Sequence, residues 1–276
     1  MEPISVTDAE LSCMVEAARQ AGQAAMRYFR LGQTVSKAAD VREKSHDNPL
    51  TKADLEANRI LYDLLLAGRS DWGWLSEETV DDANRLQRER VWVVDPIDGT
   101  KEFIAGLPQF AVSIGLVIAG QPAAACVYNP AADELYTARR GTGTRLNGKI
   151  VQTSRRDQLS GASCLASRSE TQRGEWAPFE TEFRLTTMGS IAYKLALVAA
   201  GRYDITFTLT PKNEWDYCAG LLLVEEAGGK VTSLQGEPCR FNQVNTRTPS
   251  LLASNGPLQI PLLERLRGIS LGPDRH

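Results

Sequence analysis

VWVVDPIDGTKEF, residues 91–103, describes a buried strand followed by two closely spaced aspartates. The four apolar residues at 91–94 are typical of a strand that is covered on both faces. Pro96 has no N–H to donate to a neighbouring strand, so we expect the chain to leave the sheet there. Gly99 permits a tight turn, and Thr100 is then expected to cap a short helix.

This stretch predicts an oxygen-rich site. Asp95, Asp98 and the Ile97 carbonyl would face one point beside the free N–H groups of a helix start. Carboxylate and carbonyl oxygens are the ligands that Mg²⁺ prefers, and a helix start suits a phosphate. A cation between them removes the repulsion between the phosphate and the carboxylates. Asp, Pro and Gly are also ordinary turn formers, so a plain turn stays open for this stretch taken alone.

Two acidic positions elsewhere in the chain support the metal interpretation. Glu77 and Glu78 follow a strand predicted at residues 72–75, where a carboxylate can join Asp95 at the same sheet edge. The alternative is a solvated acidic loop, which we favour for Glu78. Asp216 lies just before an apolar run. The helix dipole alone would favour an aspartate at such a helix start, and that is compatible with metal binding.

The remaining sequence divides into two halves that differ in the order of their predicted helices and strands. In the first half we expect helices at residues 8–30, with a capping box of Thr7 and Glu10, and at 51–68, and strands at 72–75, 110–118, 123–128 and 134–138. In the second half we expect strands at 162–167, 183–187, 205–208, 230–233 and 251–254, and helices at 192–200, 216–227 and 258–267. Residues 37–49 are expected to form a mobile connection, and 79–90 a lid or an exposed helix. We therefore predict an α+β half over residues 1–150 and an α/β half over 151–276, built as layers of helices and sheets.

The bulk properties exclude several classes of protein. The 276 residues are 42% hydrophobic with a net charge of −3, so no basic field favours binding to a nucleic acid polymer. The five cysteines form no C-x-x-C pair, which favours reduced thiols in a cytosolic protein. Two histidines leave little material for a histidine-based catalytic site. The N-terminus does not read as a secretory signal, and the longest apolar run is too short to cross a bilayer. We expect a soluble, cytoplasmic protein.

Three motifs in a fixed order identify a family resemblance. They are SEE at Ser76–Glu78, DPIDGT at Asp95–Thr100, and WDYCAG at Trp215–Gly220 followed by EEAGG at Glu225–Gly229. With these, the chain resembles the inositol monophosphatase superfamily over nearly its full length. The resemblance implies a layered αβαβα sandwich of the inositol monophosphatase/fructose-1,6-bisphosphatase type. It also implies a lithium-sensitive phosphatase that commonly dimerises.

The resemblance assigns roles to individual residues. The implied ligands of two or three Mg²⁺ ions are Glu77, Asp95, Asp98, Asp216 and the Ile97 carbonyl. A water bound to the Glu77-held ion would be activated by Asp54 and Thr100 and attack phosphorus in line. Thr51 and Asp54 also form a capping-box pattern, which is the structural alternative for Asp54.

Within the superfamily the chain looks most like the 3′(2′),5′-bisphosphate nucleotidases of the CysQ type. This resemblance rests on residues 75–103, on Lys101-Glu102, and on GSIAYK at Gly189–Lys194. It implies hydrolysis of the 3′-phosphate of adenosine 3′,5′-bisphosphate, and of its sulfated relative 3′-phosphoadenylyl sulfate. The implied substrate-binding residues are Gly99, Thr100, Lys101, Gly189, Ser190 and Lys194.

The alternatives stay open at this point. Leu209 stands where inositol phosphatases typically place a substrate-gripping Glu, which weakens an inositol substrate without excluding it. Tyr193 is either an adenine platform or a core tyrosine, and Lys212 is either a phosphate ligand or a solvated lysine. The rival enzymes are an inositol-1-phosphate and a fructose-1,6-bisphosphate phosphatase. The rival from another class is a non-catalytic metal- or nucleotide-binding protein.

Overall fold

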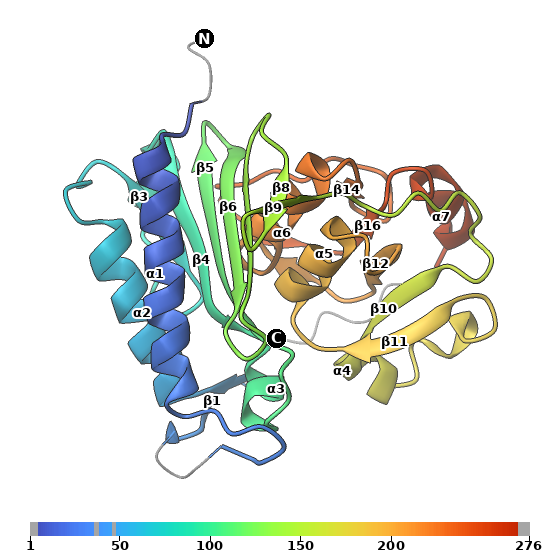
Figure 1. Cartoon of the computed structure of the whole chain (residues 1–276), viewed down its shortest axis with the longest axis horizontal. Helices are drawn as coiled ribbons and strands as arrows, with labels where there is room; N and C mark the ends of the chain where they lie inside the picture. Colours follow the sequence, from blue (N-terminus) through green and yellow to red (C-terminus); the bar gives the residue numbers. More distant parts are fainter. Residues whose placement is uncertain (1–4, 36–38, 46–47, 270–276) are drawn as a thin grey trace.

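The first sheet has seven strands and carries two helices on its outer face. The computed structural model describes residues 5–35, 39–45 and 48–269. The strands, in spatial order, are β3 (Gly73–Ser76), β4 (Arg90–Asp98), β5 (Ala111–Ile118), β6 (Gln121–Asn129), β7 (Glu134–Arg139), β8 (Thr144–Leu146) and β9 (Lys149–Val151). Only β3 and β4 among them pair in parallel. Helices α1 (Asp8–Met26) and α2 (Lys52–Leu65) bury their apolar faces against this sheet (Figure 1).

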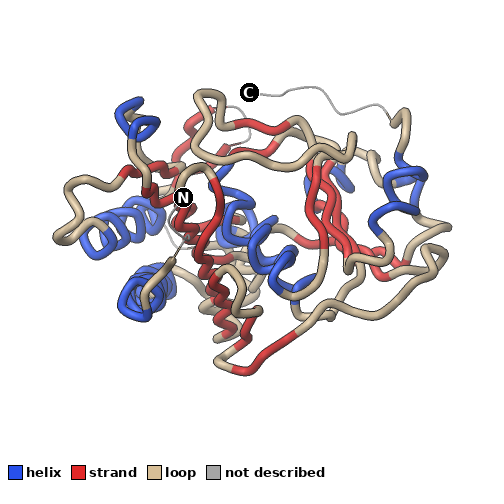
Figure 2. The backbone as a smooth tube through the Cα atoms, turned by 90° about the horizontal axis from the view of Figure 1, so that it is seen from above, coloured by secondary structure: helices blue, strands red, loops and turns tan. Residues whose placement is uncertain are grey.

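The second sheet has five strands and lies on the far side of two buried helices. Its strands, in spatial order, are β11 (Arg184–Met188), β10 (Ser163–Ser167), β12 (Ile205–Thr208), β16 (Leu251–Ser254) and β14 (Lys230–Thr232). Helices α5 (Ile191–Ala199) and α6 (Glu214–Glu226) fill the space between the two sheets, and α7 (Gln259–Leu266) covers the outer face of the second (Figure 2). The predicted αβαβα sandwich is confirmed.

Shorter elements complete the chain. They are the hairpin β1 (Arg42–Ser45) and β2 (Asn48–Leu50), the helix α3 (Thr100–Ile104), the helix α4 (Arg168–Gln172), the pair β13 (Lys212–Asn213) and β15 (Arg247–Thr248), and the 3₁₀ helices η2 (Ala83–Gln87) and η3 (Ala177–Phe179). The sequence analysis assigned none of these except α3. Each is too short to show a periodic apolar pattern.

Two expectations concern connecting segments. The connection predicted at residues 37–49 contains the paired strands β1 and β2, and residues 37–38 and 46–47 of that prediction lie outside the described residues. Residues 79–90 contain the short 3₁₀ helix η2, which is mostly exposed, so the exposed-helix alternative describes this segment better than a lid. Arg85 within it is the exception and is only 2% exposed, because it binds partners from a distant loop.

The strand at residues 91–94 continues past Pro96, contrary to the prediction. Asp95 pairs with Ser113 and Asp98 with Ala111, so β4 holds one residue more than β5 over this interval. Such a β-bulge leaves the extra residue unpaired, which removes the need for an N–H at the proline. Gly99, with φ of 95°, is the N-cap of α3, and Thr100 is its first residue rather than its cap.

Other details agree with expectation. The capping box of Thr7 and Glu10 starts α1, which ends at Met26 instead of residue 30. All five cysteines are free. Among the described residues, no helix combines the length and the apolar character that crossing a bilayer requires. The division into halves at residue 150 stays a prediction.

Candidate metal centre and active site

The bulge in β4 turns two aspartates toward the same face of the sheet. In a regular strand, residues 95 and 98 would point to opposite faces because side chains alternate. Val91 and Val93 pack into the core shared with α5 and α6, and alternation places Asp95 on this side. The extra residue between Asp95 and Asp98 turns the Asp98 side chain to the same face of the sheet as that of Asp95. Both carboxyl groups therefore face the interior helices.

Asp98 is fixed by the start of α5. Its Oδ2 accepts hydrogen bonds from Ser190 Oγ at 2.5 Å and from Ala192 N at 2.6 Å. Ser190 adopts φ of 53°, which is unfavourable for a residue with a Cβ. A Cβ at Gly189 would lie 1.9 Å from Cδ of Glu102, so no larger residue fits there. The GS dipeptide predicted to touch substrate thus also orients Asp98.

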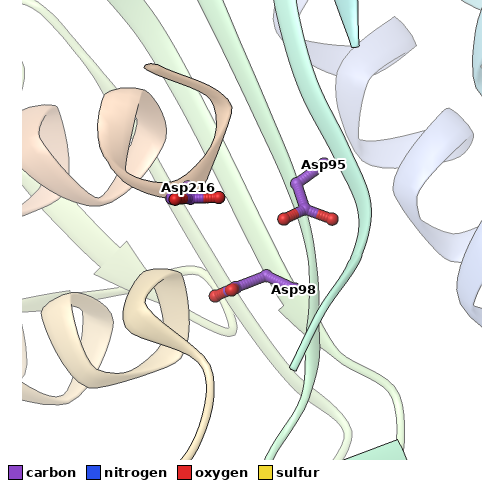
Figure 3. Close-up of side chains that lie close together, drawn as sticks. All are labelled: Asp95, Asp98 and Asp216. Atoms are coloured by element: carbon purple, nitrogen blue, oxygen red, sulfur yellow. The ribbon is translucent and has the colours of Figure 1, made fainter. Parts of the chain in front are cut away.

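Asp216 reaches the same point from the first turn of α6. Its Oδ2 accepts the N–H of Asn213 at 2.8 Å, in a capping box that starts the helix. Figure 3 shows its carboxyl group turned toward those of Asp95 and Asp98, which come from β4. One oxygen of each of the three carboxyl groups lies within 4.8 Å of those of the other two.

The electrostatics of this trio call for a cation. Burial raises the pKa of Asp98 to about 6 and that of Asp216 to about 7. Burial and the neighbouring carboxylates of Glu77 and Asp98 hold the pKa of Asp95 well above its usual range. Crowded, buried carboxylates resist ionisation together unless a positive charge compensates them. Their oxygen donors fit a hard divalent ion such as Mg²⁺.

Glu77 lines the same cleft and is paired with a lysine. Lys44 Nζ, from β1, lies 2.9 Å from Glu77 Oε1 and also donates to Glu78. The solvated loop that we favoured for Glu78 is wrong, because its side chain is only 3% exposed. Burial raises the pKa of Glu78 to about 7. The sequence analysis missed Lys44, which it placed in a mobile connection.

Thr100 lines the cleft, and Asp54 lies directly behind it. Thr100 Oγ1 is 3.2 Å from Asp54 Oδ1 and 3.0 Å from the Ile97 carbonyl oxygen. The other oxygen of Asp54 accepts the N–H and the hydroxyl of Thr51, at 2.8 and 2.6 Å. Asp54 therefore takes part in the capping box with Thr51 and is also paired with Thr100, so the structural alternative and the predicted pairing are both present. Burial raises the pKa of Asp54 to about 6.

The cleft has a volume of about 230 Å³ and contains every predicted substrate-binding residue. Its acidic residues are Glu77, Asp95, Asp98, Glu102 and Asp216, and its basic residues are Lys101, Arg168, Lys194 and Lys212. Sequence reasoning did not find Arg168, which opens a stretch without any recognisable motif. Lys194 is 2% exposed, and among the described residues no hydrogen bond reaches its ammonium group.

Two open questions about substrate contacts are answered. Tyr193 is a core tyrosine, because its hydroxyl donates to Glu134 at 2.9 Å and its ring packs edge-on against Tyr136. It does not line the cleft. Leu209 is buried beneath the second sheet with the apolar side chains of Phe207 and Trp176, so it offers the cleft no polar group.

Comparisons of sequence and structure identify known proteins that are similar to this chain. The chain matches the inositol monophosphatase family over residues 7–267. It is 37% identical to an inositol-1-monophosphatase of Rhizobium meliloti, over 82% of this chain and 86% of that protein. It is 33% identical to the Nus factor SuhB of Xylella fastidiosa, over 89% and 90% of the two chains. The crystal structure of the extragenic suppressor protein SuhB from Bartonella henselae is similar with a TM-score of 0.80 and 31% identity, over 95% of this chain and 100% of that one.

Proposed function

Because the chain belongs to the inositol monophosphatase family, it is a phosphoric monoester hydrolase, and we propose that it is magnesium-dependent with inositol-1-phosphate as its first candidate substrate. The observation that carries the metal dependence is the convergence of Asp95, Asp98 and Asp216. The relatives described above are named inositol-1-monophosphatase or SuhB. They therefore favour the inositol alternative over the predicted CysQ-type specificity.

The metal would be held by acidic side chains from separate segments. We assign Asp95, Asp98, Asp216 and Glu77 as ligands, together with the Ile97 carbonyl, because all five residues line the cleft. When bound, Mg²⁺ supplies charge neutralisation, an acidified water and a Lewis acid for the phosphoryl oxygens. Lys44 must then share Glu77 or move away from it, because its ammonium group already occupies one oxygen of that carboxylate.

Asp54 and Thr100 form the proton path. The Thr100 hydroxyl can donate to Asp54 Oδ1 and accept a proton from an attacking water with its lone pair. Asp54 has a pKa near 6 and is therefore largely ionised at neutral pH, as a general base needs to be. The two hydrogen bonds from Thr51 keep the carboxylate from rotating. The N–H groups of Gly99 and Thr100 would hold phosphoryl oxygens, and both residues line the cleft.

A second candidate substrate is adenosine 3′,5′-bisphosphate, which one feature of the cleft favours. Lys194 is buried and faces the cleft without a hydrogen-bond partner among the described residues. Lys212 and Arg168 line the same cleft. A substrate with a phosphate outside the metal cluster would satisfy this cation. Inositol-1-phosphate offers no second phosphate to it, so its charge is then balanced only by protein carboxylates such as Glu170 and Asp98.

A substrate panel tests the proposal and separates the candidates. Phosphate release with and without MgCl₂ would be measured for inositol-1-phosphate, fructose-1,6-bisphosphate, adenosine 3′,5′-bisphosphate and 3′-phosphoadenylyl sulfate. The highest kcat/KM is expected for inositol-1-phosphate. If a nucleotide is preferred, the second candidate replaces the first. No Mg²⁺-dependent release from any of them would leave a non-catalytic metal- or nucleotide-binding protein.

The variant Lys194→Met sharpens the distinction. A buried lysine that binds a second phosphate contributes a charge-assisted hydrogen bond, and its loss raises KM for a bisphosphate about tenfold or more. The same variant should leave KM for inositol-1-phosphate within about twofold. Equal losses for both substrates would mean that Lys194 supports the site as a whole.

A further inference from the structure

We propose that Arg85 and Glu214 are positioning residues that set the spacing between the Glu77 and Asp216 sides of the metal centre. Neither residue lines the cleft. Arg85 lies in η2, eight residues after Glu77, and Glu214 lies two residues before Asp216. This inference rests on the proposed function, because it assumes that the centre holds Mg²⁺.

Arg85 uses its guanidinium to join two segments that are far apart in the sequence. Its Nε and Nη2 bind the two carboxylate oxygens of Asp81, at 2.6 and 2.8 Å. Its Nη1 donates to Asn242 Oδ1 at 2.8 Å, and Nη2 donates also to the carbonyl of Gln243 at 3.0 Å. Asn242 Nδ2 returns a hydrogen bond to the Arg85 carbonyl at 3.1 Å. The loop after Glu77 is thus fastened to residues 242–243.

Glu214 fastens the same residues to the start of α6. Its two carboxylate oxygens accept the N–H groups of Asn242 and Gln243, at 2.7 and 2.8 Å. The side chain is only 1% exposed. Asn242 adopts φ of 57°, an uncommon conformation that these hydrogen bonds hold in place. One short loop therefore connects Arg85 with the helix that carries Asp216.

Packing leaves this connection little freedom. The guanidinium of Arg85 is almost completely buried, and β3 passes so close that a Cβ at Gly73 would lie 3.0 Å from the Cβ of Arg85. Metal ligands that come from separate segments bind tightly only if those segments are held at the right separation. Groups that hydrogen-bond directly to metal ligands typically change metal affinity by 10–100-fold when they are lost, and a network one step farther from the ligands is expected to change it less. The connection described here has the position and the rigidity for that role.

A purely structural role is the competing explanation, and metal affinity distinguishes the two. Breaking a buried charged network lowers stability whatever the role. A structural network would lower the Tm in EDTA and leave Mg²⁺ binding to the folded protein unchanged. A positioning network weakens Mg²⁺ binding itself. A high Mg²⁺ concentration fills a metal site whose affinity is reduced. The kcat of such a variant should therefore recover at high Mg²⁺.

The test is a titration of the full chain and of Arg85→Met and Glu214→Gln with MgCl₂, followed by calorimetry and by the fluorescence of Trp215 and the other tryptophans. We expect Mg²⁺ affinity to fall about fivefold in each variant, less than the 10–100-fold that follows the loss of a group bonded to a ligand. Arg139→Met is the control, since Arg139 also joins two elements, β7 and the start of α1, and neither element carries a proposed metal ligand. Its Mg²⁺ affinity should match the wild type.

Each possible result of this titration supports or overturns the positioning role of Arg85 and Glu214. Mg²⁺ affinities within twofold of the wild type in the folded variants would overturn the positioning role. If either variant fails to fold, Asp81→Asn is the milder change, because Asp81 is 44% exposed and its loss only loosens Arg85. That variant should weaken Mg²⁺ binding about threefold, and an unchanged affinity would refute the inference. A wild-type chain that binds no Mg²⁺ would instead remove the proposed function.

Discussion

Thr100 Oγ1 lies 3.2 Å from Asp54 Oδ1, which joins the start of α3 to the start of α2 behind the metal centre. Asp54 is 1% exposed, and among the described residues its hydrogen bonds come from threonines: Thr51 on one oxygen and Thr100 on the other. A buried carboxylate without a fixed cationic partner is costly for stability. The contact with Thr51 caps α2, and the contact with Thr100 fits the proposed task in proton transfer.

Asp54→Asn should therefore lower kcat about 10²–10⁴-fold, the range of a lost general base. The asparagine keeps the shape of the side chain and can still accept from Thr51, so folding and Mg²⁺ affinity should stay close to the wild type. Phosphate release at saturating Mg²⁺ gives the rate, and calorimetry gives the affinity. Parallel loss of metal binding and rate would instead place Asp54 among the groups that support the metal ligands.

Asp95→Asn should abolish turnover, with a loss of about 10³-fold or more, while the fold persists. Asp95 is a member of the carboxylate trio, and asparagine can still accept the N–H of Ile97 as Asp95 does at 3.0 Å, so its replacement removes charge while keeping this backbone contact. A loss of about 4 kcal/mol in transition-state stabilisation corresponds to this factor. Circular dichroism checks the fold. Activity near that of the wild type would rule out the assigned metal centre.

How far the sequence predicts this site depends on the kind of residue. Asp95, Asp98 and Asp216 were predictable because they stand at the ends of apolar runs, where strands and helices terminate at a common edge. The fact that Asp95 and Asp98 share a face was not derivable, because it depends on a bulge whose position is set by the pairing of β4 with β5. The register in which two strands pair is set by the tertiary structure, so the sequence of one strand does not reveal it.

The residues that the sequence did not predict also depend on contacts between distant segments. Lys44 lies on a short hairpin with no apolar alternation, and Arg85 lies in a charged segment that reads as solvent-exposed. Both are buried or half-buried because distant acidic or carbonyl partners receive them. Composition cannot reveal such partners. Glu78 was predicted to be solvated for the same reason, since the lysine that covers it lies 34 residues earlier.

The metal-free protein should lose stability as pH rises, and Asp216→Asn should reduce that loss. The pKa of Asp216 is near 7 in the folded state against an ordinary value of 3.8, so the folded chain binds the extra proton between these values. Stability therefore falls as pH rises through this window. In EDTA, the Tm of Asp216→Asn relative to the wild type should increase between pH 5 and pH 7.5, by several degrees. The corresponding energy is on the order of 2–4 kcal/mol.

The same comparison in excess MgCl₂ serves as the control. A bound cation compensates the carboxylate charge, so the wild type should regain stability at pH 7.5 and become the more stable of the two proteins. A Tm difference that does not vary with pH in EDTA would show that Asp216 is ionised in the folded, metal-free protein, against the pKa given above.

Lys44→Met should strengthen Mg²⁺ binding. The ammonium of Lys44 lies 2.9 Å from Glu77 Oε1, so the ion and the lysine compete for one carboxylate. The Lys44 side chain is 22% exposed, and partly exposed pairs contribute about 1 kcal/mol at most, which corresponds to a gain of at most about fivefold in affinity. Calorimetric titration with MgCl₂ measures it, with Arg42→Met on the same hairpin as the control. Weaker binding in Lys44→Met alone would mean that the lysine instead holds Glu77 in place for the metal.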